Sequence, residues 1–289
     1  MRVPALASAA LILLSAVAYA DGYQSKPAIA PGPTGWHYQF TPHDLHDWDA
    51  NHVPVLADLP IGGRTRKVVM VANRNGFFYT LDRATGELLV AKPFIDPTWA
   101  KKIGADGRPV LLPGHTPTEA GTLTCPQLNG GTSFMSPSFD PDTNTFFVTA
   151  RQTCEIYFGR PQTFVPGRQY TGGTTRLPRS QHERFSALRA LDPATGGRKW
   201  EFRYPNPNPP TRGPAAISNS GVLSTASGLV FAGDAHGRVL AFDSRTGKNL
   251  WQYQTGYPLR ATGGTTYLLD GRQQLLVPSG PVLTAFALP

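Results

Sequence analysis

The chain has 289 residues, of which only 16% are charged, while 30 glycines and 28 prolines make turns frequent. This composition is typical of a turn-dense β protein and excludes a helical bundle and a disordered tail. A formal net charge of +8 suggests nucleic acid, but the basic residues are scattered and no nucleic-acid motif is present. We therefore interpret the charge as a solvated basic surface, with a docking face for an acidic partner protein as the alternative.

Residues 1–20 carry a targeting pattern. Arg2 precedes an apolar run that ends in an A-x-A motif, as in a secretory signal peptide. We predict export and cleavage after Ala20, followed by a linker over residues 21–35. No later segment approaches the ~18 consecutive apolar residues of a membrane span, so none is expected after cleavage.

The stretch TPHDLHDWDANH, residues 41–52, gathers carboxylates and imidazoles around one tryptophan. One interpretation is a polar loop between strands, because Asp and His are common turn residues. Another is a transition-metal site made by His43, His46 and His52, although their spacing fits no helical H-x-x-x-H pair. We expect His43 and Asp44 to brace the loop.

Three segments share the pattern apolar-Asp-x-x-Thr-Gly-x-x-x-Trp/Val: LDRATGELLV (81–90), LDPATGGRKW (191–200) and FDSRTGKNLW (242–251). Each predicts a hairpin, in which Asp bonds to its own backbone and Gly supplies a positive φ. The closing tryptophan begins the next strand and is placed to pack between neighbouring sheets. We expect both Trp200 and Trp251 in the core.

The repeat spacing predicts propeller blades of four strands. Between Val90 and Trp200 the chain has room for two blades, or for one blade with long excursions. We favour one blade, because residues 159–180 and 204–214 are loop-like and rich in turn residues. The weaker copy FDPDTNTFFV (139–148) is interpreted as a different hairpin of the same sheet.

The segment TGWHYQF (34–40) matches the end of the repeat without its beginning, so the chain enters its first repeat halfway. We predict an all-β fold of three blades plus part of a fourth. Such an incomplete ring leaves sheet edges exposed.

Four motifs, WHYQFTPHDLHDWDA, NRNGFFYTLDRATGELL, SGVLSTASGLVFAGD and AFDSRTGKNLWQYQTG, resemble the quinoprotein alcohol dehydrogenases. These are eight-bladed periplasmic enzymes that use pyrroloquinoline quinone (PQQ) and a Ca²⁺ or lanthanide ion. The resemblance covers residues 36–289, which would form a partial propeller domain equivalent to the C-terminal half of such an enzyme. It implies oxidation of primary alcohols to aldehydes, with electrons passing to a separate c-type cytochrome.

The resemblance also assigns residue roles. Asp47 falls on the catalytic base and metal ligand, and Asp49 on the additional carboxylate of lanthanide-using members, where calcium-using members carry a small uncharged residue. In an extended segment both carboxylates would point toward one ion. Arg74 falls on the arginine that contacts the quinone oxygens. Ser133 and Asn219 fall on cofactor-pocket positions where relatives usually have other residues.

Cys125 and Cys154 are the two cysteines, and in an exported chain they are either bridged or two buried free thiols. Their 29-residue spacing resembles the second disulfide of the family. We interpret a bridge there as structural.

Three functional hypotheses follow from these residues. The chain is an alcohol dehydrogenase half that acts with a separately supplied N-terminal half, or a non-catalytic exported scaffold that binds a protein partner. The third is a truncated or split gene product that folds poorly, because its partial ring buries little apolar surface and has open strand edges; homodimerisation of two half rings would remedy both.

Overall fold

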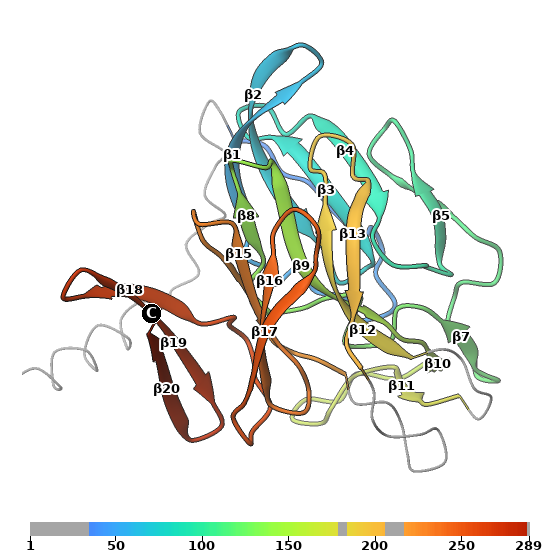
Figure 1. Cartoon of the computed structure of the whole chain (residues 1–289). Helices are drawn as coiled ribbons and strands as arrows, with labels where there is room; N and C mark the ends of the chain where they lie inside the picture. Colours follow the sequence, from blue (N-terminus) through green and yellow to red (C-terminus); the bar gives the residue numbers. More distant parts are fainter. Residues whose placement is uncertain (1–34, 179–183, 206–216, 288–289) are drawn as a thin grey trace, which may run out of the picture. The chain divides into compact units, whose positions relative to one another are not determined.

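The computed structural model describes residues 35–178, 184–205 and 217–287 (Figure 1). The chain divides into two units, Met1–His37 and Tyr38–Pro289. All regular structure in the described residues is β-strand, as the sequence predicts.

The predicted signal peptide (residues 1–20) and residues 21–34 of the predicted linker lie outside the described residues. Within the described part, no helix has the length and apolar character needed to cross a membrane.

The first sheet is antiparallel and has four strands in sequence order. They are β1 (Val55–Ile61), β2 (Arg64–Ala72), β3 (Phe77–Asp82) and β4 (Leu88–Pro93). Strand β3, FFYTLD, is aromatic and buried on both faces because structure packs against both sides of the sheet. The first repeat forms the predicted turn: Asp82 Oδ1 accepts from the N–H groups of Ala84 (2.9 Å) and Thr85 (3.1 Å), and Gly86 has φ +76°.

The second sheet has the order β13-β12-β9-β8. Its strands are β8 (Ser138–Asp140), β9 (Thr145–Gln152), β12 (Phe185–Leu191) and β13 (Arg198–Arg203). The chain between Val90 and Trp200 therefore forms one blade with excursions, and the weaker repeat copy is the β8–β9 hairpin of that blade. Both predictions are confirmed.

The excursions form two small sheets. One pairs β5 (Ala100–Ile103) with β6 (Pro109–Leu111), and the other joins β7 (Thr122–Thr124), β10 (Glu155–Gly159) and β11 (Gly173–Arg176). The stretch expected to be a loop, residues 159–180, therefore contains a strand. A disulfide joins Cys125 and Cys154 at the ends of the paired strands β7 and β10, so the bridged alternative is confirmed.

The last two sheets follow in sequence order. The third has four strands, β14 (Val222–Ser224), β15 (Leu229–Gly233), β16 (Arg238–Asp243) and β17 (Asn249–Gln254). The fourth has three in the described residues, β18 (Thr265–Leu269), β19 (Arg272–Ser279) and β20 (Val282–Ala287). Three full blades and part of a fourth, with open edges, agree with the sequence prediction.

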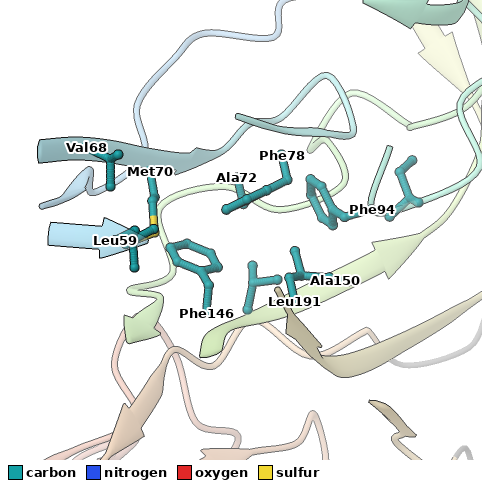
Figure 2. Packing of buried hydrophobic residues seen from close by; sticks show 11 residues of the cluster. Leu59, Val68, Met70, Ala72, Phe78, Phe94, Phe146, Ala150 and Leu191 are labelled. Atoms are coloured by element: carbon teal, nitrogen blue, oxygen red, sulfur yellow. The ribbon is translucent and has the colours of Figure 1, made fainter. Parts of the chain in front are cut away.

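Apolar layers between consecutive sheets form the core (Figure 2). In Figure 2, Met70 and Phe78 of the first sheet face Phe146 and Ala150 of the second. The next residue of β9, Phe147, belongs instead to the layer between the second and third sheets. Because β9 is buried on both faces, the adjacent residues Phe146 and Phe147 enter different apolar layers, and its sequence does not alternate between apolar and polar residues.

The two repeat tryptophans differ in environment. The indole N–H of Trp200 donates to the Ser244 carbonyl at 2.9 Å, and the ring lies against Gly247 in the next blade's turn. A Cβ at Gly247 would come within 2.6 Å of that ring. Trp251, by contrast, is 39% exposed, so its predicted core position is wrong.

Candidate active site

The loop over residues 41–52 is held by Asp44, as predicted. Its Oδ1 accepts from the backbone N–H of His46 at 2.8 Å, and its Oδ2 accepts from that of Trp48 at 2.6 Å. His43 is exposed and has φ +52°, a left-handed conformation that a tight polar turn requires. The carboxylate therefore fixes the backbone on both sides of Asp47.

His46 and Trp48 attach this loop to the rest of the molecule. The His46 ring stacks on Trp48 with centroids 4.3 Å apart and meets Tyr157 of β10 edge-on at 5.0 Å. Burial is the main reason that the pKa of His46 lies below its ordinary value. The indole N–H of Trp48 donates to the Gln127 carbonyl at 3.2 Å. His46 and Trp48 are thus packing residues that hold the carboxylate-bearing loop.

Asp47 is exposed and borders an open depression of about 900 Å³ formed with the β10–β11 hairpin. Its φ is +60°, so the prediction of an extended segment here is wrong. Asp49 is not among the residues that line this depression. The two carboxylates therefore sit in different surroundings on either side of the buried Trp48.

Asp49 approaches Arg74, with Oδ2 and Nη1 3.6 Å apart. The Asp49 side chain is 71% exposed, whereas that of Arg74 is 9% exposed. The separation is too long for a direct hydrogen bond, so the carboxylate oxygens of Asp49 stay open to solvent and to a cation. Arg74 follows β2, and its Nη2 donates to the Leu128 carbonyl at 2.5 Å.

A second buried arginine, Arg151 of β9, lies near Arg74 and was missed from the sequence. Its Nη1 donates to Asn219 Oδ1 at 2.8 Å, and its Nη2 donates to the Asn129 carbonyl. Burial and the nearby charge of Arg74 lower the pKa of Arg151 to about 10. One sequence signal could have found it: Arg151 is the charged residue in the otherwise uncharged buried run TFFVTARQ.

The loop that carries Ser133 connects the two arginines. Gly131 donates its N–H to the Arg74 carbonyl at 2.8 Å, and its own carbonyl accepts from the Arg151 N–H at 2.7 Å. Ser133, two residues later, is 6% exposed.

His52 lies near the same two guanidinium groups. Both of its ring nitrogens are buried and make no hydrogen bond of good geometry, and the Thr132 backbone is the polar group that acts on the ring. Burial, with Arg74 and Arg151 adding to it, lowers the pKa of His52 to about 4. The side-chain Nε atoms of both arginines are also buried without a partner. Unsatisfied buried donors of this kind need an acceptor, so the cluster fits an anionic ligand rich in oxygen atoms.

The structure thus brings Asp49, Arg74 and Asn219 into one cluster through Arg151, while Asp47 lies on the depression.

The described residues fit a metal ion less well than they fit an anionic ligand. No group of three or more His, Cys, Asp and Glu side chains in the described residues is arranged to hold a metal ion, which argues against the three-histidine site. Asp47 and Asp49 supply two carboxylates, whereas Ca²⁺ takes six to eight oxygen ligands.

Comparison with known proteins identifies the repeat type. Residues 28–92 match the family model described as "Glucose/ethanol/alcohol dehydrogenase, beta-propeller domain", and residues 177–283 match that of "Outer membrane protein assembly factor BamB". A quinoprotein ethanol dehydrogenase of Pseudomonas aeruginosa is 35% identical over 260 residues, which are 86% of this chain and 40% of the relative. A lanthanide-dependent methanol dehydrogenase of Methylacidiphilum fumariolicum is 35% identical over 257 residues, with the same two shares.

Solved structures agree with these matches. A quinohemoprotein alcohol dehydrogenase from Comamonas testosteroni superposes with a TM-score of 0.76 at 29% identity, over 85% of this chain and 36% of that one. A europium-containing methanol dehydrogenase gives 0.75 at 33% identity, over 84% and 42%.

These superpositions identify the fold as part of a β-propeller. Within that class, the chain is a homologue of the quinoprotein alcohol and methanol dehydrogenases, so the predicted resemblance is confirmed. The chain spans about 40% of the length of the curated relatives that it matches.

Proposed function

We propose that this chain is the part of a PQQ- and metal-dependent alcohol dehydrogenase that carries the catalytic base and a cofactor-binding arginine. The observation that supports this most is the approach of Asp49 to Arg74 at 3.6 Å, with Asp47 two residues earlier on the same braced loop. The substrate class is a primary alcohol, which would leave as an aldehyde.

In this proposal Asp47 accepts the hydroxyl proton of the alcohol, and its exposure leaves the carboxylate open to substrate. Asp47 and Asp49 are the carboxylates that would supply oxygen ligands to a Ca²⁺ or lanthanide ion, and the acidic side chain of Asp49 would favour the more highly charged lanthanide. PQQ, when bound, would supply the oxidant that accepts the hydrogen of the alcohol carbon as hydride, and the two electrons would pass on to a separate c-type cytochrome.

The arginine cluster would hold the cofactor. The partly unsatisfied guanidinium groups of Arg74 and Arg151 offer N–H donors and positive charge to carboxylate and quinone oxygens. The neutral His52 ring offers one N–H donor but no charge. Ser133 and Asn219 would border the same ligand. Asn219 acts by orienting Arg151, to which it is hydrogen-bonded at 2.8 Å.

The remaining metal ligands and the rest of the cofactor pocket would come from a separate N-terminal half or from a second copy. We further propose that the chain is periplasmic and is cleaved after Ala20. Determining the N-terminal residue of the exported protein tests the cleavage, and a mature chain that still begins at Met1 would contradict it.

A non-catalytic exported scaffold that binds a protein partner is the second candidate. It is favoured by the Arg151–Asn219 hydrogen bond, because it gives one donor of the buried guanidinium a partner within the protein instead of leaving it for a ligand. The family match over residues 177–283 to an outer-membrane assembly factor points in the same direction.

Dye reduction distinguishes the two candidates. The folded chain is mixed with a primary alcohol, PQQ and either Ca²⁺ or La³⁺, with and without a co-expressed N-terminal half. We expect turnover that is lost in Asp47→Asn and retained in Asp58→Asn, a matched acidic residue of β1. An absence of turnover in every mixture by a demonstrably folded chain would favour the scaffold.

A further inference from the structure

One end of the propeller domain carries the sequence of a fourth strand, and the sheet at the other end lacks a fourth strand in the described residues. In the second and third sheets the fourth strand begins near a repeat tryptophan, and in the third sheet that strand reads WQYQ (251–254). Residues 36–39 read WHYQ, with three of these four residues identical. The chain thus carries a fourth-strand sequence before its first sheet.

Residues 35–40 have the side-chain alternation of a strand. Trp36, Tyr38 and Phe40 are half-buried, whereas His37 and Gln39 between them are exposed. The structure does not assign residues 35–40 to a β-strand.

The fourth sheet lacks a fourth strand in the described residues. Its described residues form three strands, and β20 is its edge. Val282 and Leu283 of β20 are 44% and 61% exposed, and the strand VLTAFA contains no charge and no proline to protect its edge.

Register can be transferred from the third sheet. Phe242 of β16 pairs with Val230 of β15, and its side chain packs toward the second sheet. In the same way, Phe286 of β20 pairs with Leu275 of β19, and its side chain packs toward the third sheet. Trp251 lies opposite Ala241, the residue before Phe242. The equivalent residue before Phe286 is Ala285, so a strand containing Trp36 would place that tryptophan opposite Ala285.

We propose that a second copy of this chain supplies the fourth strand: residues 35–40 of each copy pair antiparallel with β20 of the other. The contact is reciprocal, so a two-fold dimer forms two identical strand additions and closes on itself. Neither strand carries a carboxylate, Lys or Arg, so the net charge of +8 adds no local repulsion. Once one contact forms, the second becomes intramolecular.

The number of repeat sheets in two copies equals the number of blades that a closed ring requires. In the described residues each copy has three four-stranded sheets and one three-stranded sheet of the repeat, so two copies have eight such sheets. Eight is also the number of blades expected for the complete propeller. The pairing concerns assembly and does not depend on the proposed activity.

Register also fixes which residues suit a cross-link. Thr255 donates its N–H to the Gly237 carbonyl, so these two residues form a hydrogen-bonded pair. In an antiparallel ladder hydrogen-bonded and non-hydrogen-bonded pairs alternate along the strands. Counting back three pairs, Gln252 and Leu240 form a pair that is not hydrogen-bonded. The equivalent pair across the proposed contact is His37 with Thr284. Cα atoms in such pairs lie about 4.5 Å apart, which a disulfide can span.

The test uses the full chain carrying both His37→Cys and Thr284→Cys. We expect oxidation to give a covalent dimer on a non-reducing gel, while each single variant gives much less. Gln39→Cys with Thr284→Cys is the register control, and its yield should be lower. Monomers from the first pair, or equal yields from both pairs, would overturn the proposal.

A second measurement uses light scattering with Leu283→Pro. The equivalence places the Leu283 N–H toward the added strand, so proline is tolerated at the free edge but blocks pairing. We expect the wild type and Leu283→Ala to have twice the monomer mass, and Leu283→Pro to weaken the dimer about tenfold or more. A monomeric wild type, or one that pairs only with a supplied N-terminal half, would assign the edge to another partner and refute the second copy.

Discussion

Replacing Trp200 with Ala tests how consecutive sheets are held together. The substitution removes a ring that packs on Phe147 (centroids 5.6 Å apart) and on the Gly247 backbone, and it leaves the Ser244 carbonyl without its donor. Fully buried Trp→Ala changes cost ~3–5 kcal/mol. Because Trp200 is half-buried, we expect the lower end of that range, about 3 kcal/mol. For a domain of this size the melting temperature should fall by roughly 6–12 °C.

Trp251→Ala is the matched control, because this residue occupies the same repeat position but is 39% exposed. We expect it to cost about 1 kcal/mol or less. Both variants are compared by thermal unfolding and by urea titration. Equal losses for the two variants, or no loss for Trp200→Ala, would refute the packing argument.

Three further predictions concern the site and its supports. The pKa of His52 falls from 6.5 to about 4 on folding, so the unfolded chain takes up the proton first and stability falls as pH drops through that interval. We expect a loss of roughly 3 kcal/mol that His52→Gln abolishes in urea titrations at several pH values; an unchanged pH slope would contradict the burial of His52. Asp44→Ala should cost about 2 kcal/mol because two backbone N–H groups lose their acceptor, while Asp44→Asn costs less; equal denaturation midpoints would count against the brace. Replacing Cys125 and Cys154 together by Ser should cost ~3–4 kcal/mol, since their bridge closes a 29-residue separation, and an unchanged midpoint would show that the bridge contributes nothing.

The repeats made most of the fold predictable. The Asp-x-x-Thr-Gly pattern specifies a local turn, because its Asp carboxylate and Gly φ act within six residues, as at Asp82 and Gly86. Strand pairing on either side of that turn follows from the hairpin. One blade between Val90 and Trp200 was predictable because residues 159–180 are rich in turn residues, although they contain the short strand β11 of a separate small sheet.

Features that depend on distant partners were not predictable. Trp251 contacts Phe286 of β20 edge-on at 5.1 Å and still stays 39% exposed, and the Arg151–Asn219 hydrogen bond joins residues 68 positions apart. The positive φ of Asp47 arises from the two hydrogen bonds that Asp44 accepts around it, which a period-two pattern does not reveal.

Calorimetric titration of PQQ with La³⁺ tests the central functional claim most directly. The folded chain is titrated together with a separately expressed N-terminal half, and Arg74→Met is compared with Arg108→Met, an arginine distant in sequence from the cluster. The account predicts a single PQQ site that Arg74→Met weakens at least about tenfold and Arg108→Met leaves unchanged. Equal PQQ affinity in the wild type and Arg74→Met, or an absence of binding by the folded mixture, would contradict it.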